Sequence, residues 1–433
     1  MRGYPKYQET GLDWLGKVPA HWSLGKLGTC FSERNEKVSD TEYPALSVTK
    51  NGIVPQMEHV AKTDAGDNRK KVCKNDFVIN SRSDRKGSAG VSDYEGSVSL
   101  ISTVLESRFY LPKFAHHLFR SYNFQEEFYR FGKGIVADLW STRYAEMKNI
   151  VVPLVPHEEQ KAIASFLDRE TARIDNLIAE KQSFINLLKE KRQALISHVV
   201  TKGLDPNVKM KDSGVEWIGE VPEHWELKKL KYVGKIQSGI AKGKDNADKD
   251  VIDVPMLRVA NVQDGYLDLE NVHTIQIEPR ELERYSLQYG DVLMNEGGDN
   301  DKLGRGAVWR EATSPCIHQN HVFALRMQKI EPEWLELLTQ SSYAKFYFYY
   351  HSKQSTNLAS ISATNIKQTP LVVPPKSERT EIINFLNKEL ARSQNLYNQV
   401  LGSIDLLKEH RTALISAAVT GKIDVRNYKE KAA

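Results

Sequence analysis

Six short segments of the chain combine the side-chain types that contact DNA. Arginine and lysine can bridge guanine O6 and N7, asparagine and glutamine can pair with adenine, and any cation can contact a phosphate. We expect each segment to be a loop that leaves a strand, although the alternative for each is a solvated loop without a ligand. The predicted contact residues are Asn80, Arg82, Arg85, Lys86, Trp140, Ser141, Thr142 and Arg143 in the first half, and Arg258, Asn261, Lys302, Arg305, Gln319, Asn320, Ser360, Ser362 and Asn365 in the second.

The residues that catalysis on DNA would require do not occur in the necessary arrangements. An amino-methyltransferase needs an (N/D)PP(Y/F) loop, but the only Pro-Pro pair, Pro374-Pro375, lies at a predicted helix start. A PD…(D/E)xK nuclease needs a Pro-Asp dipeptide, which is absent, and GIAKGK at 239–244 is one residue short of a phosphate-binding loop. His318 and His321 could supply two metal ligands, but no third accompanies them. The sequence therefore predicts no catalysis and no metal, with 318–321 a polar surface or a DNA contact.

An internal duplication positions these segments. Residues 10–27 (TGLDWLGKVPAHWSLGKL) and 213–230 (SGVEWIGEVPEHWELKKL) share 10 of 18 positions at an offset of 203. Residues 187–205 (LLKEKRQALISHVVTKGLD) and 406–424 (LLKEHRTALISAAVTGKID) share 12 of 19 positions at an offset of 219. The matching ends and the diverged middles predict two copies of one scaffold that carry two different working regions.

Each copy ends in a long predicted helix with heptad spacing. The helices begin near Pro156 and Pro375, because proline suits the first helical turn, and end near Gly203 and Gly421. Each has about 43 residues and hence a length of about 65 Å. The apolar seams consist of Ile163, Phe166, Leu167, Ile174, Ile178, Ile185, Leu188, Leu195 and Val199, and of Ile382, Leu386, Leu390, Tyr397, Ile404, Leu407, Leu414 and Ala418. Two seams in matching register predict an antiparallel two-stranded coiled coil rather than packing of each helix on its own domain alone.

The regions between the matching ends are expected to contain strands and short helices. Strands are predicted at 43–48, 76–80, 254–259 and 290–295, and amphipathic helices at 113–131 and 333–350. The aromatic run at 346–350 is interpreted as a stripe packed on the domain, with base stacking as the alternative. Trp14, Trp22, Trp217 and Trp225 recur in both copies. Since shared residues cannot distinguish two DNA sequences, we interpret them as packing between domain and helix.

The composition is that of a multi-domain cytoplasmic protein. The 433 residues are 40% hydrophobic and 27% charged, and no stretch of 18 apolar residues occurs. Cys30, Cys73 and Cys316 are scattered and fit reduced thiols. A net charge of +4 permits nucleic-acid binding but does not argue for it alone.

With these motifs in place, the chain resembles the specificity (S) subunits of type I restriction-modification systems over essentially its whole length. The resemblance rests on the paired WxGxVPxHW motifs at 14–22 and 217–225, on the helix starts VPHEEQ and PPKSER, and on the matching ALIS helix ends. It implies an α+β chain with two globular target recognition domains, separated by two long antiparallel helices that form a coiled coil, and an internal pseudo-twofold repeat. The predicted boundaries are 1–155 and 204–373 for the recognition domains, 156–203 and 374–424 for the helices, and 425–433 for a tail.

The resemblance also implies the partners. Each recognition domain would bind one half of a bipartite double-stranded DNA site, the helices would set the spacer and dock two methyltransferase (M) subunits, and restriction (R) subunits would join the full complex. No cofactor is expected on this chain, with S-adenosylmethionine in the methyltransferase and ATP and Mg in the nuclease. Ser377 and Arg379 replace Glu158 and Gln160 at the second helix start, so the two partner surfaces need not be equivalent. The alternative is an autonomous DNA-binding or coiled-coil assembly protein without a methyltransferase partner.

Overall fold

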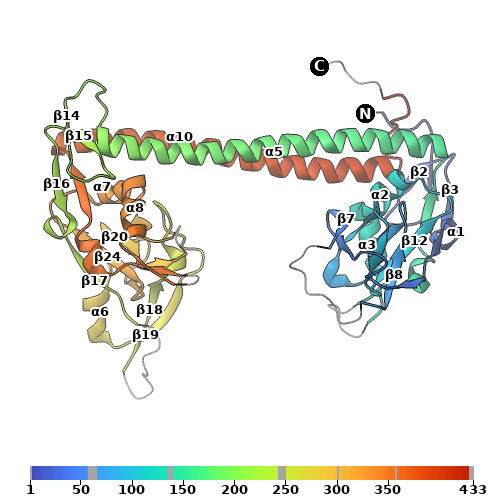
Figure 1. Cartoon of the computed structure of the whole chain (residues 1–433), viewed down its shortest axis with the longest axis horizontal. Coiled ribbons are helices and arrows are strands. Elements are labelled where there is room, and N and C mark those ends of the chain that lie inside the picture. The colour runs from blue at the N-terminus through green and yellow to red at the C-terminus, as the bar shows by residue number, and fades with distance from the viewer. Residues whose placement is uncertain are drawn as a thin grey trace. The chain divides into compact units, whose positions relative to one another are not determined.

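The computed structural model describes residues 2–56, 66–134, 140–241, 250–299, 302–355 and 358–428. The chain divides into a first unit, Met1–Lys181 with Leu401–Ala433, and a second unit, Gln182–Val400. Each unit contains one α+β domain and part of each of the two long helices, α5 (His157–Lys202) and α10 (Lys376–Val419) (Figure 1). None of the described helices is both long and apolar enough to cross a membrane.

The first unit is built around a four-stranded antiparallel sheet. Its order is β10 (Ala89–Val91), β9 (Phe77–Asn80), β12 (Ser102–Ser107) and β4 (Phe31–Glu33). A three-stranded sheet orders β11 (Gly96–Val98), β8 (Arg69–Val72) and β5 (Lys37–Val38). Three two-stranded pairs complete the sheets: β6 (Leu46–Thr49) with β7 (Gly52–Pro55), β3 (Ser23–Lys26) with β13 (Val151–Leu154), and β1 (Tyr7–Glu9) with β2 (Lys17–Pro19). The short helices are α1 (Leu27–Cys30), α2 (Pro112–Arg120), α3 (Tyr122–Arg130), α4 (Tyr144–Met147) and the 3-10 turn η1 (Ser83–Arg85).

The second unit repeats this plan. Its four-stranded antiparallel sheet orders β17 (Gly234–Ser238), β24 (Val322–Met327), β20 (Asp291–Asn295) and β22 (Gly306–Val308). Two three-stranded sheets order β19 (His273–Ile277), β18 (Ile252–Leu257) and β23 (Ile317–His318), and β21 (Gly297–Gly298), β26 (Ala359–Ser360) and β25 (Lys353–Gln354). The remaining pairs are β16 (Glu226–Lys229) with β27 (Pro370–Val373) and β14 (Met210–Asp212) with β15 (Glu220–Pro222). The short helices are α6 (Pro279–Tyr285), α7 (Pro332–Thr339), α8 (Ser342–Tyr350), α9 (Ala363–Lys367), η3 (Leu230–Tyr232) and η4 (Val259–Asn261).

Each amphipathic segment predicted at 113–131 and 333–350 is two helices rather than one. The break falls at Ser121 between α2 and α3 and at Ser341 between α7 and α8. Each serine caps the second helix, since its side chain accepts a hydrogen bond from the backbone N–H of Phe124 or Ala344. In the aromatic run on α8, Tyr347 and Phe348 are buried while Phe346, Tyr349 and Tyr350 are exposed, so only part of the stripe packs on the domain.

The long helices pack against each other in antiparallel orientation within both units, as the heptad seams predicted. Helix α5 has 46 residues and α10 has 44, and each is followed by a glycine with positive φ, Gly203 at 78° and Gly421 after a one-residue turn at 71°. In the first unit the early turns of α5 share a hydrophobic core with Leu414 and Ala418 near the end of α10. In the second unit the last turns of α5 share a core with Ile382 and Leu386 near the start of α10. The fold class expected from the sequence is therefore confirmed.

A carboxylate, buried in the first unit and partly exposed in the second, joins each WxGxVPxHW motif to a long helix. Glu159 of α5 accepts hydrogen bonds from Trp22 Nε1 at 3.1 Å and from the Tyr4 hydroxyl at 2.9 Å, and His21 Nε2 lies 2.6 Å away. Glu378 of α10 accepts from Trp225 Nε1 at 3.0 Å. Both carboxylates lie in the first helical turn, where the helix dipole favours negative charge. The prediction that these tryptophans pack between domain and helix is thus confirmed for Trp22 and Trp225.

The other two tryptophans of the motif contact the second short helix of each domain. Trp14 lies edge-on to Phe124 of α3 with 5.7 Å between ring centroids, and Trp217 lies 5.8 Å from Phe346 of α8. Trp14 also belongs to the hydrophobic core that contains Ile163 of α5 and Ala418 of α10, and Trp217 packs against the core that contains Val199 of α5, so for these two tryptophans packing between domain and helix stays a prediction.

Of the two positions named as different at the helix starts, one is buried and one is exposed. Gln160 is fully buried and accepts a hydrogen bond from the backbone N–H of Leu111 at 2.7 Å. Arg379, at the matching position, is 5% exposed and forms an ion pair with Glu331. Both of these side chains fasten the helix to its own domain, so this position contributes little to the exposed surface. Only Glu158 and Ser377 present the difference to solvent.

Candidate nucleic-acid interface

The two predicted DNA-contacting segments of the first unit lie side by side. The backbone N–H of Ser83 donates to the Trp140 carbonyl at 2.9 Å, and that of Thr142 donates to the Ser81 carbonyl at 2.9 Å. Ser141 Oγ donates to Ser81 Oγ at 3.0 Å. These bonds join a turn after β9 to the strand-like segment before α4, although about 60 residues separate them in the sequence. The structure therefore gathers predicted contact residues into one surface, which we call the first polar edge (80–86 and 140–143).

The first polar edge exposes cations and one aromatic ring. Arg82, Arg85 and Arg143 are exposed, and Trp140 is 39% exposed. Lys86 pairs with Glu126 of α3. Thr142 is fully buried and donates to the Phe128 carbonyl at 2.9 Å, so this side chain holds the edge in place.

A cleft of about 670 Å³ opens beside the first polar edge. Asn80 and Arg85 line it together with Lys50, Arg69 and residues of β6. Asn80 Oδ1 accepts the backbone N–H of Arg82 at 3.1 Å, which orients its amide. A cleft lined by an amide, serines and guanidinium groups has the donors and acceptors that a base edge or a phosphate requires.

In the second unit, two backbone segments form the same pairing with different side chains, and we call each such pairing a junction. The backbone N–H of Ile361 donates to the Glu296 carbonyl at 2.9 Å, which matches the bond from Thr142 to Ser81. Gly297 pairs with Ser360 as Arg82 does with Ser141. A cleft of about 440 Å³ at this junction is lined by Gln319 and Ser360, with Lys353 and Gln354 of β25. We call this surface the second polar edge (297–298, 319–321, 353–354 and 360).

Lys302 adjoins the second polar edge at Gly298. A side chain at Gly298 would bring a Cβ atom to 3.3 Å from the Lys302 Cβ, so the lysine covers this glycine. The Lys302 ammonium pairs with Asp299, and that hydrogen bond lowers the pKa of the Asp299 carboxyl. Asn300 and Asp301, which precede Lys302 in the same polar segment, lie outside the described residues.

Five other predicted contact residues of the second unit mainly hold loops. Asn261 is 3% exposed and donates to the carbonyls of Asp268 at 2.8 Å and Asn271 at 3.1 Å. Ser362 caps α9, and Asn365 Nδ2 donates to the His351 carbonyl at 2.8 Å. These side-chain groups are already bonded within the domain. Arg258 is half-buried, and the partly buried Asn320 donates its backbone N–H to the Ile240 carbonyl at 2.9 Å.

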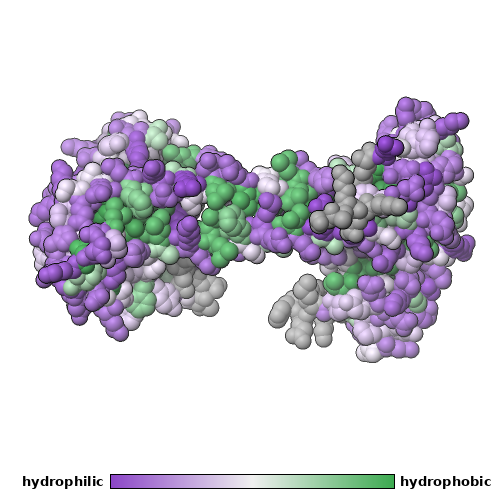
Figure 2. All heavy atoms as spheres, turned by 90° about the horizontal axis from the view of Figure 1, so that it is seen from above, coloured by the Kyte–Doolittle hydropathy of each residue, from purple (hydrophilic) through white to green (hydrophobic). Residues whose placement is uncertain are grey.

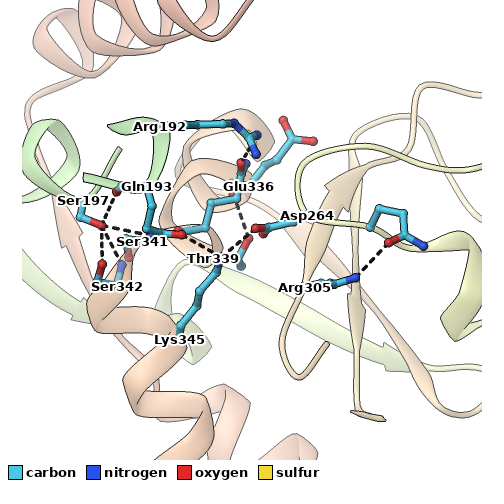
Figure 3. A network of polar contacts seen from close by, with 12 residues as sticks. Arg192, Gln193, Ser197, Asp264, Arg305, Glu336, Thr339, Ser341, Ser342 and Lys345 are labelled. Atoms are coloured by element: carbon cyan, nitrogen blue, oxygen red, sulfur yellow. Dashed lines mark hydrogen bonds and ion pairs between the residues drawn. The ribbon is translucent and has the colours of Figure 1, made fainter. Parts of the chain in front are cut away.

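Arg305 belongs to a polar network that reaches helix α5 within the second unit (Figure 3). Its guanidinium donates to Gln263 Oε1 at 3.0 Å, and the neighbouring Asp264 accepts from Lys345 Nζ at 2.7 Å. Lys345 also donates to Gln193 of α5 at 2.9 Å. Arg192 of α5 donates to Gln340 Oε1 at 2.6 Å. Sequence patterns gave no sign of this network, because its members come from four separate segments.

The histidines at 318 and 321 do not form half of a metal site. His318 is fully buried, its Nδ1 lies 2.7 Å from the Val322 carbonyl, and burial lowers its pKa. The expectation of a polar surface or DNA contact is therefore wrong for His318. His321 is exposed and its Nδ1 lies 2.9 Å from Glu296 Oε2. Across the described part of the chain, no three His, Cys, Asp or Glu side chains gather in a metal-binding group.

Apolar side chains also reach the surface of the long helices. Phe184 and Leu187 of α5 are 42% and 60% exposed in the second unit, and Leu406 of α10 is 66% exposed in the first. Figure 2 shows hydrophobic patches among polar side chains on the face that it presents. Large exposed apolar side chains that cluster on a helix are typical of surfaces that bind other proteins.

Comparison with known proteins finds similar sequences. Residues 222–401 match the family model described as the type I restriction modification DNA specificity domain. The type I restriction enzyme EcoKI specificity subunit of Escherichia coli (strain K12) is 23% identical over 434 residues, which covers 94% of this chain and 90% of that protein. The MjaX specificity subunit of Methanocaldococcus jannaschii is 26% identical over 217 residues, so this chain spans only 50% of its length.

The fold is also found among solved structures. A chain from a structure described as the basis of complex assembly and conformational transition of the type I R-M system aligns with a TM-score of 0.68 and 16% identity. The alignment covers 93% of this chain and 98% of that chain, and at this identity it shows the shared fold alone. Together with the specificity-domain match, these similarities confirm the resemblance that the paired motifs indicated: the chain is similar in sequence and in fold to the specificity subunits of type I restriction-modification systems.

Proposed function

We propose that the chain directs a type I restriction-modification complex to a bipartite DNA target, with one half-site bound by each polar edge. The observation that carries this proposal is the repeated junction with changed side chains. Both units join the same two backbone segments, through Ser81–Thr142 and Glu296–Ile361, yet present arginines at one junction and glycine, glutamine and serine at the other. A scaffold that is repeated within the chain but carries different hydrogen-bonding groups suits the recognition of two different base sequences.

We further propose that the long helices bind two methyltransferase subunits and that restriction subunits complete the complex. The exposed apolar residues of α5 and α10 support this partner surface. S-adenosylmethionine would belong to the methyltransferase, and ATP and Mg to the nuclease. An autonomous DNA-binding or coiled-coil assembly protein is the competing function, and copurification of the chain with a methyltransferase subunit would distinguish the two.

Exchange of one domain between related proteins tests the bipartite function. Replacement of residues 28–150 by the matching region of a related subunit is expected to change one half of the methylated sequence and to leave the other half and the spacer unchanged. The reason is that the replaced region contains the first polar edge but not the motif or the helices that recur. Methylome sequencing of the host gives the result. The reciprocal exchange of residues 231–369 is the control and is expected to change the other half. A single exchange that altered both halves would contradict independent recognition.

The catalytic assignment gives a second expected result. The purified chain is expected to show no methyl transfer, DNA cleavage or ATP hydrolysis, because the motifs for those activities do not occur in the sequence. Addition of a methyltransferase subunit and S-adenosylmethionine is expected to give adenine methylation at the bipartite site. Incorporation of labelled methyl groups into unmodified duplex DNA measures both reactions, and incorporation by the chain alone would refute the assignment.

A further inference from the structure

A second cleft of the second unit, away from the predicted contact residues, is lined by cations. It has a volume of about 530 Å³ and lies along β17, an edge strand of the four-stranded sheet. Lys235, Arg284 and Arg326 line it, together with the polar side chains of Gln237, Ser238 and Tyr285. No carboxylate is among the described residues that line the cleft.

The strand register places two of these cations directly opposite each other. Lys235 of β17 pairs with Arg326 of β24. Like charges at directly opposed positions of an antiparallel pair are destabilising. Arg326 is compensated from the strand on its other side, because it lies opposite Asp291 of β20, its guanidinium donates to both oxygens of Asp291 at 2.8 Å, and Asp291 is only 1% exposed. Lys235 is exposed, and no ion pair links it to a carboxylate in the described part of the chain.

Helix α6 fixes the third cation at the rim. Gln237 donates its side-chain amide to the backbone carbonyl of Arg284, which ties the end of α6 to the edge strand. The Arg284 guanidinium is exposed and lies 5.2 Å from the centroid of the Tyr285 ring. The cleft is therefore a built feature in which a helix and a strand hold separate cations on one surface.

The cleft adjoins the second polar edge through the backbone. Gly239, at the end of the cleft, packs so closely on the next segment that an added Cβ atom would lie 2.1 Å from the His318 carbonyl oxygen. Ile240 then forms a bridge with Gln319, which lines the cleft of the second polar edge. An extended ligand seated at Gln319 could thus continue along β17 toward Lys235.

At the equivalent strand positions of the first unit, a serine and a carboxylate replace the two cations. Ser32 of β4 faces Glu106 of β12 at the positions that Lys235 and Arg326 occupy in the second unit. The buried carboxylate persists as Asp76, but its arginine partner, Arg34, directly follows β4 and is not on β12. The fold therefore does not require a basic pair at this level of the sheet.

From these observations we propose that Lys235, Arg284 and Arg326 form a DNA phosphate-binding cleft, specific to the second unit, that holds the backbone beside the half-site at Gln319. The inference rests on the proposed function and deepens it by assigning contacts that position the duplex without contributing to base discrimination. The first unit, with Glu106 at the matching position, lacks this contact and relies on the arginines of its own polar edge.

Salt dependence of DNA binding tests the cleft. The full chain, in complex with its methyltransferase partner, is titrated against a fluorescent duplex that carries the methylated site and against a scrambled duplex, over a series of salt concentrations. Each neutralised phosphate contributes about 0.9 to the slope of log K against log salt in B-DNA. Lys235→Ala and Arg284→Ala are each expected to reduce the slope by about one and the double variant by about two. Both duplexes are expected to lose affinity by the same factor, and the methylated sequence is expected to stay unchanged.

Lys211→Ala provides the matched control, since Lys211 is an exposed strand lysine of the same unit outside the cleft. Its slope is expected to equal that of the wild type. Arg326 is left intact, because its removal would leave Asp291 buried without its partner. If the double variant kept the wild-type slope of log K against log salt while the wild type bound DNA normally, the phosphate-binding role of the cleft would be contradicted and the proposed function would not. A loss of affinity only for the duplex with the methylated site would show that these residues contact bases and would contradict a phosphate contact. Failure of the wild-type complex to bind DNA would contradict the proposed function instead.

Discussion

Seven residues added to each long helix are expected to abolish methylation at the original target and, where a new target is methylated, to lengthen its spacer. The insertions are placed between Ile178 and Ala179 in α5 and between Leu407 and Lys408 in α10, both in the first unit. Arg411 of α10 donates to Asp175 of α5, and the two insertion points lie the same number of residues after Asp175 and before Arg411, hence at one level of the antiparallel pair.

The physical reason is the fixed rise of the helix. Seven residues keep the heptad phase, so the seam is preserved, and they add about 10 Å at about 1.5 Å per residue. This length corresponds to about three base pairs at roughly 3.4 Å each. Half-sites bound from one face of the DNA are expected about one helical turn apart, on the order of 10 base pairs. A longer spacer therefore also rotates one half-site about the DNA axis relative to the other. DNA bending can absorb a part of this change.

Methylome sequencing reports both the half-sites and the spacer. The two half-site sequences are expected to persist, since neither polar edge is altered. Glu180→Gln, a change of the same helix without a change of length, serves as control and is expected to leave methylation unaffected. Normal methylation at the original spacer by the lengthened chain would show that the helices do not set the spacing.

Loss of the Glu159 carboxylate is expected to destabilise the first unit by about 3 kcal/mol. Glu159→Ala leaves the buried Trp22 indole N–H and the Tyr4 hydroxyl without their acceptor. It also removes a negative charge from the first turn of α5. Burial, and next the Glu159 charge, raise the pKa of Tyr4, which therefore remains a hydrogen-bond donor throughout the physiological range.

The duplication supplies an internal comparison for this variant. Glu378→Ala, at the matching position of α10, is expected to cost less, because the Glu378 side chain is 28% exposed against 10% for Glu159 and water can reach the donors left behind. Glu158→Ala, at the exposed neighbouring position, is expected to change stability by less than about 0.5 kcal/mol. Urea unfolding followed by tryptophan fluorescence measures all three. An equal effect of Glu159→Ala and Glu158→Ala would contradict the role of the buried carboxylate.

Features that depend on local pattern could be predicted from the sequence. The heptad seams predicted α5 and α10 and their antiparallel pairing, because periodicity specifies which helix face must be buried. The duplicated motif indicated that Trp22 and Trp225 pack between domain and helix. The structure adds that a glutamate at each helix start accepts a hydrogen bond from the indole N–H. Family resemblance followed from the same local matches.

Features that depend on which segments meet were decided only by the tertiary structure. The backbones of Ser81 and Thr142 form a strand-like pairing that the hydrophobic periodicity of the sequence does not predict. This pairing determines which arginines share a surface. Burial also separates residues of the same type, since Asn80 lines a cleft whereas Asn261 bonds to backbone in a loop. The opposition of Lys235 and Arg326 arises from strand register between segments about 90 residues apart. A hydrogen bond or a charge acts through distance in space, and the sequence specifies that distance only for neighbours along the chain.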